Sequence, residues 1–249
     1  NELNINHNYV YNDTADGKYS EGITINNREL VINGNGYAVD GSNHARILLV
    51  TQCNLTINNL ILTDGLSSYR SGISAIEANM VLNNVTFKNM NSTQAGSCLI
   101  SGGSLTIEDS SFINTTSEKG SAVFGAYGDI KISNSEIRTS HSDWGAVYLI
   151  GTNANIANTD FVNSNYASAV YATGSKVMID KSKFTNLKSN KTAGAIGSKE
   201  SKEVIIKNSE FKNISCEKNG GSLYFDLVEN VEISNSTFTH SYAEFGGAI

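Results

Sequence analysis

Apolar residues recur along this chain at intervals of between 23 and 27 residues. An Ile or a Leu stands five positions before each recurring residue, and a further apolar residue stands two positions before that. Apolar positions that alternate with polar ones predict short β-strands, and no stretch shows the sustained period of an amphipathic helix. We call the recurring position the marker; it is occupied by Leu62, Phe87, Phe112, Ile137, Phe161, Phe184, Phe211 and Phe238.

A turn is predicted inside every repeat, three residues before the marker. Asn and Asp tolerate left-handed backbone geometry and suit a tight corner, and stacked Asn amides can bond from one repeat to the next. The residues at this position are Asn59, Asn84, Asp109, Asn134, Asn158, Lys181, Asn208 and Asn235, so only Lys181 breaks the pattern. A second segment, typified by Gly120-Ser-Ala-Val123, adds a bend and then an apolar residue that should point inward.

About three short strands per repeat, stacked coil on coil, predict an all-β fold: a single-stranded, right-handed parallel β-helix of about eight to ten rungs. We expect this solenoid to occupy residues 30–249. Residues 1–29 have a different pattern and are expected to form an N-terminal cap. The C-terminal end, inside a repeat, is expected to be uncapped, which would make the chain a fragment of a longer surface protein.

Composition and charge exclude several classes of function. The net charge is −6, and the 18 Lys and Arg residues are scattered, so we expect no binding to nucleic acid. No apolar run is long enough for a membrane helix, so we expect no membrane insertion. The three cysteines are too far apart in the predicted register for a disulfide. The four histidines are also dispersed, which predicts no metal site and no cofactor.

Aromatic residues follow the second inward position in several repeats. If Val123, Val147 and Val170 point inward, the residues after them point outward as a stack on which sugar rings or a partner surface could pack. An aromatic ladder that only stabilises the fold is the alternative. The candidate ligand-binding residues are Phe124, Trp144, Tyr148, Tyr166, Tyr171 and Tyr224.

Charged residues beside the markers allow an enzymatic alternative. Glu136 and Asp160 on adjacent rungs could stand about 5 Å apart, as in a retaining carboxylate pair, with Lys183 next along the row. Repeats this short leave no insertion that could enclose a substrate, and alternating exposed charges are often cross-strand pairs. Polysaccharide lyase or hydrolase activity is therefore the less favoured reading, and no catalytic residue is assigned.

The opening segments Asn8-Tyr-Val-Tyr-Asn12, Gly22-Ile-Thr-Ile25 and Ile32-Asn-Gly-Asn-Gly-Tyr-Ala-Val-Asp-Gly41, together with the repeated GGAI-like and F-x-N elements, resemble the adhesin-like surface proteins of methanogenic archaea. The resemblance covers essentially the whole chain. It implies an extracellular, surface-displayed β-helix and names no ligand. The function expected from residues and resemblance together is a non-enzymatic adhesin whose partners are extracellular glycans or the surface proteins of another cell. A passive structural stalk is a further alternative.

Overall fold

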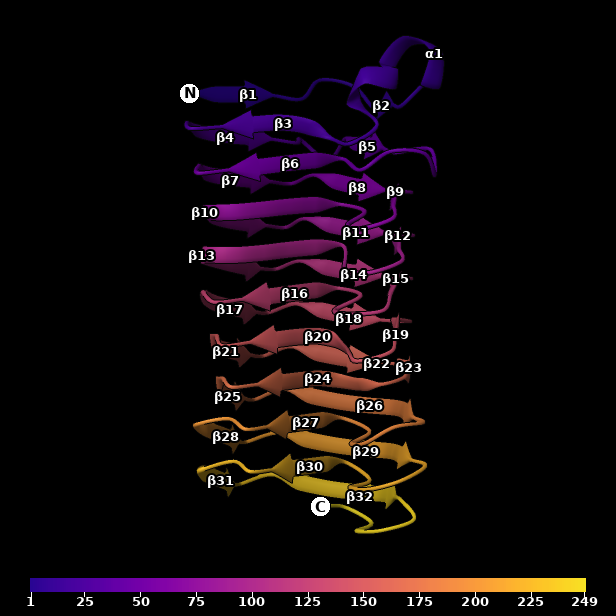
Figure 1. Ribbon diagram of the computed structural model, residues 1–249, viewed down its shortest axis with the longest axis vertical. Helices are drawn as coiled ribbons and strands as arrows, with labels where there is room; N and C mark the ends of the chain where they lie inside the picture. The colour runs from indigo at the N-terminus through magenta and orange to yellow at the C-terminus, as the bar shows by residue number, and fades with distance from the viewer.

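The computed structural model describes the backbone of all 249 residues and the side chain of every residue except Tyr166. The chain winds into a parallel β-solenoid of about ten turns, so the prediction of an all-β parallel β-helix is confirmed (Figure 1). Each strand pairs in parallel with its counterparts in the coils before and after it, as Val123 of one coil pairs with Val147 of the next. The alternating apolar residues therefore form columns that run along the axis.

Most coils contain four strand positions, some of them merged into longer strands, where the sequence indicated about three. The first segment comprises β3 (Ile23–Asn26), β6 (Leu48–Thr51), β16 (Val123–Ala126), β20 (Gly145–Ile150), β24 (Ser168–Thr173), β27 (Ile196–Lys199) and β30 (Leu223–Asp226). The second comprises β1 (Glu2–Asn4), β4 (Glu29–Asn33), β7 (Asn54–Asn58), β17 (Asp129–Ser133), β21 (Asn153–Ala157), β25 (Lys176–Asp180), β28 (Glu203–Lys207) and β31 (Asn230–Ser234). In two coils these segments join into the long strands β10 (Ile73–Asn83) and β13 (Cys98–Glu108).

The third segment carries the markers, and the fourth has two residues in most coils. The third comprises β2 (Tyr9–Val10), β5 (Ala38–Asp40), β8 (Ile61–Thr63), β11 (Thr86–Lys88), β14 (Ser111–Ile113), β18 (Glu136–Arg138) and β22 (Asp160–Val162). The fourth comprises β9 (Leu66–Ser67), β12 (Asn91–Ser92), β15 (Thr116–Ser117), β19 (His141–Ser142) and β23 (Asn165–Tyr166). In the last coils both merge into β26 (Lys183–Ser189), β29 (Glu210–Cys216) and β32 (Thr237–Tyr242). A fourth segment this short carries too little alternation to be seen in the sequence.

The core consists of stacked columns of identical or similar residues. Phe161, Phe184, Phe211 and Phe238 stack face to face, with ring centroids 4.8, 4.8 and 4.6 Å apart. All markers up to Phe211 are fully buried, and Phe238 in the last coil is partly buried. Because burial of a Phe or Leu side chain contributes about 1.5–3 kcal/mol, the repeat itself supplies much of the stability of the rod.

The predicted turn residues all adopt the left-handed conformation, with φ between 47° and 52°. Several of their side chains also bond along the axis, as Nδ2 of Asn84 donates to Oδ1 of Asn59 at 2.7 Å. Lys181 takes the same φ of 49° without an amide to contribute. The structure thus confirms the turn and the hydrogen-bonded ladder that the sequence predicted.

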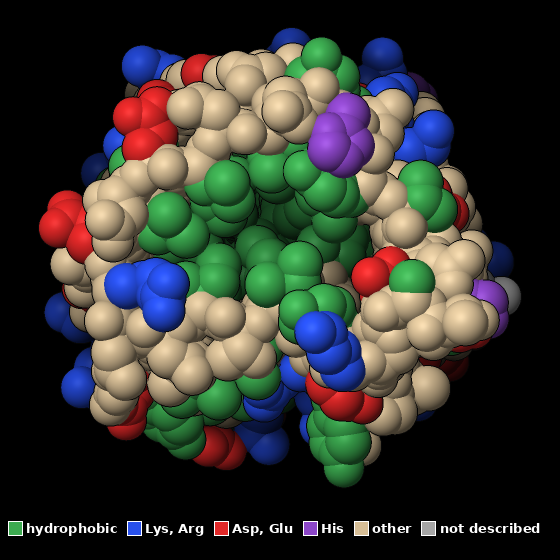
Figure 2. Space-filling model, turned by 90° about the horizontal axis from the view of Figure 1, so that it is seen from above, with side chains coloured by type: hydrophobic (Ala, Val, Ile, Leu, Met, Phe, Trp, Pro, Cys, Tyr) green, Lys and Arg blue, Asp and Glu red, His purple; other side chains and the backbone are tan. Residues whose placement is uncertain are grey.

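Residues 1–29 do not stand apart from the solenoid. Strands β1 and β2 pair with β4 and β5, which makes the segment part of the first coil. One helical turn, α1 (Asp13–Asp16), is capped by Asn12 and leads into the short 3-10 helix η1 (Gly17–Tyr19) at one side. Figure 2, which looks down on this end, shows hydrophobic side chains around a central hollow. That these residues act as a cap stays a prediction.

Candidate functional site

Four of the predicted binding residues lie on one outward-facing column of the first strand segment. Phe124 pairs with Tyr148, which pairs with Tyr171, and Tyr171 pairs with Gly197 before Tyr224 continues the line. Ring centroids are 5.6 Å apart for Phe124 and Tyr148 and 6.0 Å apart for Tyr148 and Tyr171. We call Phe124, Tyr148, Tyr171 and Tyr224 the aromatic column.

The aromatic column forms the floor of an axial groove. Its side chains point away from the core, yet Leu99, one coil before Phe124, is only 2% exposed and Tyr148 only 8%. The loops that follow the fourth segment stack from coil to coil and cover one edge of the column, as the bridge between Ala95 and Lys119 and the bond from the Trp144 amide to the Glu118 carbonyl show. Short loops therefore make a shallow groove without any insertion.

Two hollows lie along this groove. The first has a volume of about 350 Å³ and is lined by the loop residues Tyr69, Arg70 and Lys119 and by Leu99 and Phe124 of the floor, among others. The second, of about 40 Å³, is lined by Trp144, Ser168, Tyr171 and Lys191 with three neighbours. The groove thus offers apolar ring faces below and polar groups along its rim, which is the chemistry that binds sugar rings.

Trp144 links the rim to the floor. Its ring centroid lies 5.9 Å from that of Tyr148 and 6.1 Å from that of Tyr171, the latter edge-on. Nζ of Lys191 stands 5.1 Å from the Trp144 ring centroid, and such a cation–π contact contributes about 0.5–1 kcal/mol at an exposed site. Trp144 is still 40% exposed, so much of its ring is free to contact a ligand.

The hydroxyls of Tyr148 and Tyr171 stay protonated at neutral pH, because the pKa of each is raised. Burial raises the pKa of Tyr148, while a hydrogen bond with Thr173 acts in the opposite direction. Burial also raises the pKa of Tyr171, and the negative charges that Tyr148, Tyr224 and nearby carboxylates can carry add to this effect. Both hydroxyls can therefore donate to a sugar oxygen.

The structure brings together Phe124, Trp144, Tyr148 and Tyr171 of the predicted residues. Tyr224 lies on the same line but beyond Gly197, and the side chain of Tyr166 lies outside the described residues. Sequence reasoning missed Tyr69, Arg70, Lys119 and Lys191, which line the groove from the loops. The strand repeat gives no signal for these four residues, because loops of varied sequence place them beside the column.

The charged row of the enzymatic alternative lies on the marker strands. Glu136 pairs with Asp160, and Asp160 pairs with Lys183, as the register predicted. Asp160 and Lys183 are exposed, and Oε2 of Glu136 stands 3.5 Å from Nη2 of Arg138 in a surface ion pair. Pairs of exposed charges like these are common on the outer face of a β-sheet. Catalysis by Glu136 and Asp160 stays the alternative hypothesis.

Among the described side chains, no group of three or more His, Cys, Asp or Glu residues is placed to hold a metal ion. Cys53, Cys98 and Cys216 are buried and free. No helix of the described residues has the length and apolar character needed to cross a bilayer.

Comparison with known proteins leaves the family of this chain open. No protein-family model matches it, and no curated protein matches its sequence. A solved structure with a similar course of the chain is described as the Streptococcus pneumoniae surface protein and adhesin PfbA; it has 11% sequence identity and a TM-score of 0.37, over 98% of this chain and 90% of that one. A likeness at this level carries no argument about function. The resemblance to archaeal adhesin-like proteins stays a prediction.

Proposed function

We propose that this chain is a non-enzymatic, extracellular adhesin domain that binds glycans of a partner surface along the axial groove. The observation that carries the proposal is the aromatic column, whose rings face outward at the bottom of a groove with a polar rim. Stacked rings in a solenoid could serve stability alone. Rings used only for stability, however, require neither the loops beside them nor Trp144, which stays 40% exposed above the floor.

Binding along a groove suits a rod without a deep pocket. A linear glycan can contact several coils in succession, and many copies on a surface would add avidity to weak individual contacts. Truncating a ring on which a sugar stacks should cost affinity because aromatic faces supply rigid contact area.

The test is binding of the purified chain to a broad glycan array, with the retained glycans analysed for cleavage products. We expect retention without products, and loss of retention in Tyr148→Ala and Tyr171→Ala. The matched control is Tyr127→Asn, because Tyr127 is 71% exposed at a turn away from the groove and Asn readily keeps its φ of 55°. Binding unchanged in both groove variants would refute the proposal, and cleavage products would favour the enzymatic alternative at Glu136 and Asp160.

A further inference from the structure

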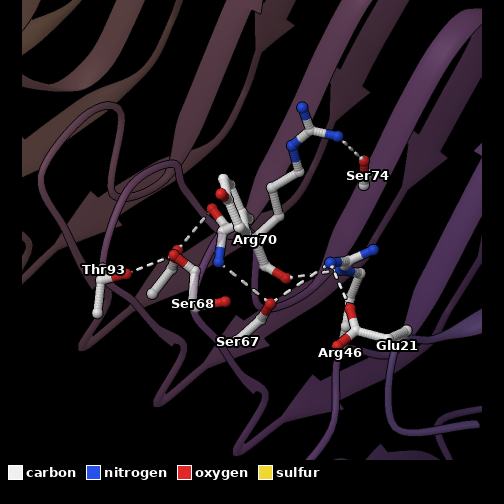
Figure 3. Close-up of polar contacts among 9 residues, drawn as sticks. Glu21, Arg46, Ser67, Ser68, Arg70, Ser74 and Thr93 are labelled. Atoms are coloured by element: carbon white, nitrogen blue, oxygen red, sulfur yellow. Dashed lines mark hydrogen bonds and ion pairs between the residues drawn. The ribbon is translucent and has the colours of Figure 1, made fainter.

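Two arginines lie side by side at the end of the groove nearer the N-terminus (Figure 3). Arg46 is buried and paired with a carboxylate: its Nη2 lies 3.0 Å from Oε2 of Glu21, and its Nε donates to the Arg70 carbonyl at 3.0 Å. Nη2 also reaches Oγ of Ser67 at 3.4 Å. Arg46 therefore has a compensating carboxylate, and its hydrogen bond to the Arg70 carbonyl holds the loop that carries Arg70.

The same loop is held from the following coil. Oγ of Ser92 donates to the Tyr69 carbonyl at 2.7 Å, and the Thr93 hydroxyl donates to the Ser68 carbonyl (Figure 3). Ser67 additionally accepts from the Tyr69 amide at 3.2 Å. Bonds from both neighbouring coils thus fix the loop before any ligand arrives, which lowers the ordering cost of binding.

Arg70 itself has no anionic partner among the described side chains within the 4.0 Å of an ion pair. Its Nη1 donates to Oγ of the buried Ser74 at 2.7 Å, and this is one of five N–H donors on the guanidinium. Burial and the nearby charge of Arg46 both lower the pKa of Arg70, which shows that its charge is poorly compensated. A half-buried cation in this state gains stability from an anion that reaches it.

Arg70 also lies where a glycan in the groove would pass. It lines the larger hollow together with Tyr69, Lys119 and Phe124, and the charge of Lys119 is matched by Glu118 at 3.7 Å. Ser74, which holds the guanidinium, stands two coils from Phe124 on the same column, about 10 Å at the spacing of parallel strands. The cation therefore belongs to the same groove as the stacking rings.

We propose that Arg70 binds the carboxylate of an acidic sugar residue, a uronate, whose neighbours in the same glycan stack on Phe124 and on the exposed ring of Trp144. The planar guanidinium can take both carboxylate oxygens, which a lysine cannot do. The chain as a whole has a net charge of −6, so attraction of acidic glycans needs a local site of this kind. The inference rests on the proposed glycan binding and specifies its ligand class.

The test compares oligogalacturonides with the same oligomers carrying methyl-esterified carboxyls, in calorimetric titrations of the intact chain. We expect the acidic oligomers to bind at least about tenfold tighter than the esters, and Arg70→Met to remove that advantage, so that acid and ester bind this variant with similar affinity. The matched control is Arg28→Met, since Arg28 is exposed, lines no part of the groove, and its side-chain Nε donates to the Asn26 carbonyl. It should behave as the wild type.

A second variant separates binding from folding, because Arg70→Met leaves Ser74 without its partner. Arg70→Lys keeps the charge and should retain part of the preference for acid over ester. Equal affinity for acid and ester in the wild type, with binding still lost in Tyr148→Ala, would overturn the uronate inference and leave the proposed function standing. If neither oligomer binds, the uronate inference is overturned. The proposed glycan binding is refuted only if the chain also binds no glycan on the array.

Competition identifies the source of the carboxylate. Poly-glutamate of matched charge should displace the oligogalacturonide poorly, because it offers no ring to stack on Phe124 and Trp144. Displacement as strong as that by the acidic oligomer itself would overturn the inference in favour of an acidic protein segment. A galactan that carries sulfate esters and no carboxylate, and that binds more tightly than the uronate, would overturn the assignment of a carboxylate.

Discussion

Gly197 shows how a single residue shapes the floor of the groove. It stands on the aromatic column between Tyr171 and Tyr224, and a Cβ built on it would lie 2.6 Å from Cδ2 and 2.9 Å from Cε2 of Tyr171. The Tyr171 ring therefore occupies the place where a side chain of the next coil would be. Because Gly197 has no side chain, no residue of the next coil stacks on the Tyr171 ring from that side.

Gly197→Ala should move the Tyr171 ring and weaken glycan binding about three- to tenfold, the equivalent of one aromatic contact of about 0.5–1.5 kcal/mol. The close contact is with a movable side chain, so the free energy of unfolding should change little. Gly17→Ala is the control, because a Cβ there meets nothing within 4 Å. Titration of both variants with a retained glycan checks this, and unchanged affinity in Gly197→Ala would show that the position of the ring is unimportant.

Cys98 carries a prediction for alkaline pH. Complete burial raises the pKa of its thiol to about 12, whereas a thiol in the unfolded chain ionises near 8.5. Below pH ~8.5 both states hold the proton and the thiol adds no pH dependence. Above it only the unfolded state ionises, so stability should fall by about 1.4 kcal/mol per pH unit until the folded thiol ionises.

Urea unfolding of the wild type and Cys98→Ala at pH 8 and pH 10 tests this. Other groups titrate in both proteins, so the informative quantity is the difference in slope: the wild type should lose about 2 kcal/mol more than the variant over that interval. A thiol reagent at pH 8 should also react with Cys98 only after unfolding. Parallel slopes would show that ionisation of Cys98 does not distinguish the two states.

At the scale of strands and turns, the repeat could be predicted because each inward position and each turn residue recurs. The left-handed turns at Asn59, Asn84 and Asn134 follow from residue type alone. The groove could not be predicted, because it depends on how loops of varied sequence lie beside the strands. Alternation indicates that Leu99 and Tyr148 face outward, yet the loops bury both, and Arg70 enters the site from such a loop.

The turn ladder predicts a stabilising substitution at Lys181, the one position where it is broken. Left-handed geometry costs an ordinary residue about 1–2 kcal/mol, which Asn largely avoids. Lys181→Asn, with φ already at 49° between Asn158 and Asn208, should raise the stability by about 1 kcal/mol and the melting temperature by about 2–4 °C.

Thermal unfolding checks this against Lys176→Asn, an exposed substitution within strand β25, where Asn has a low strand propensity. The control should be neutral or slightly destabilised. If the melting temperature rises equally in both variants, the effect comes from the lost charge. If it does not change in Lys181→Asn, the backbone at residue 181 is not strained.

At the scale of the whole molecule, the solenoid fixes the distance between Arg70 and the aromatic column by the number of coils between them. Contacts run only between neighbouring coils, so a coil can be removed where the register on both sides agrees. Deleting residues 88–112 joins Phe87 to Ile113, which follows Phe112, the direct partner of Phe87. The rod should stay folded and become one coil shorter, about 4.8 Å.

This deletion should change the spacing between the two parts of the binding site. Arg70 moves one coil closer to Phe124 and Trp144, and Ser117 and Glu118 take the places of Ser92 and Thr93 beside its loop. A carboxylate can then no longer reach the guanidinium while its neighbouring sugars stay on the rings. We expect affinity for acidic oligogalacturonides to fall about tenfold and binding of their methyl esters to persist. Deleting residues 212–238, which joins Phe211 to Thr239 in the same register, is the control: it removes Tyr224 but leaves the spacing from Arg70 to Phe124, Trp144 and Tyr171 intact. If both deletions bind the acidic oligomer like the wild type, Arg70 and the aromatic column do not act on one ligand.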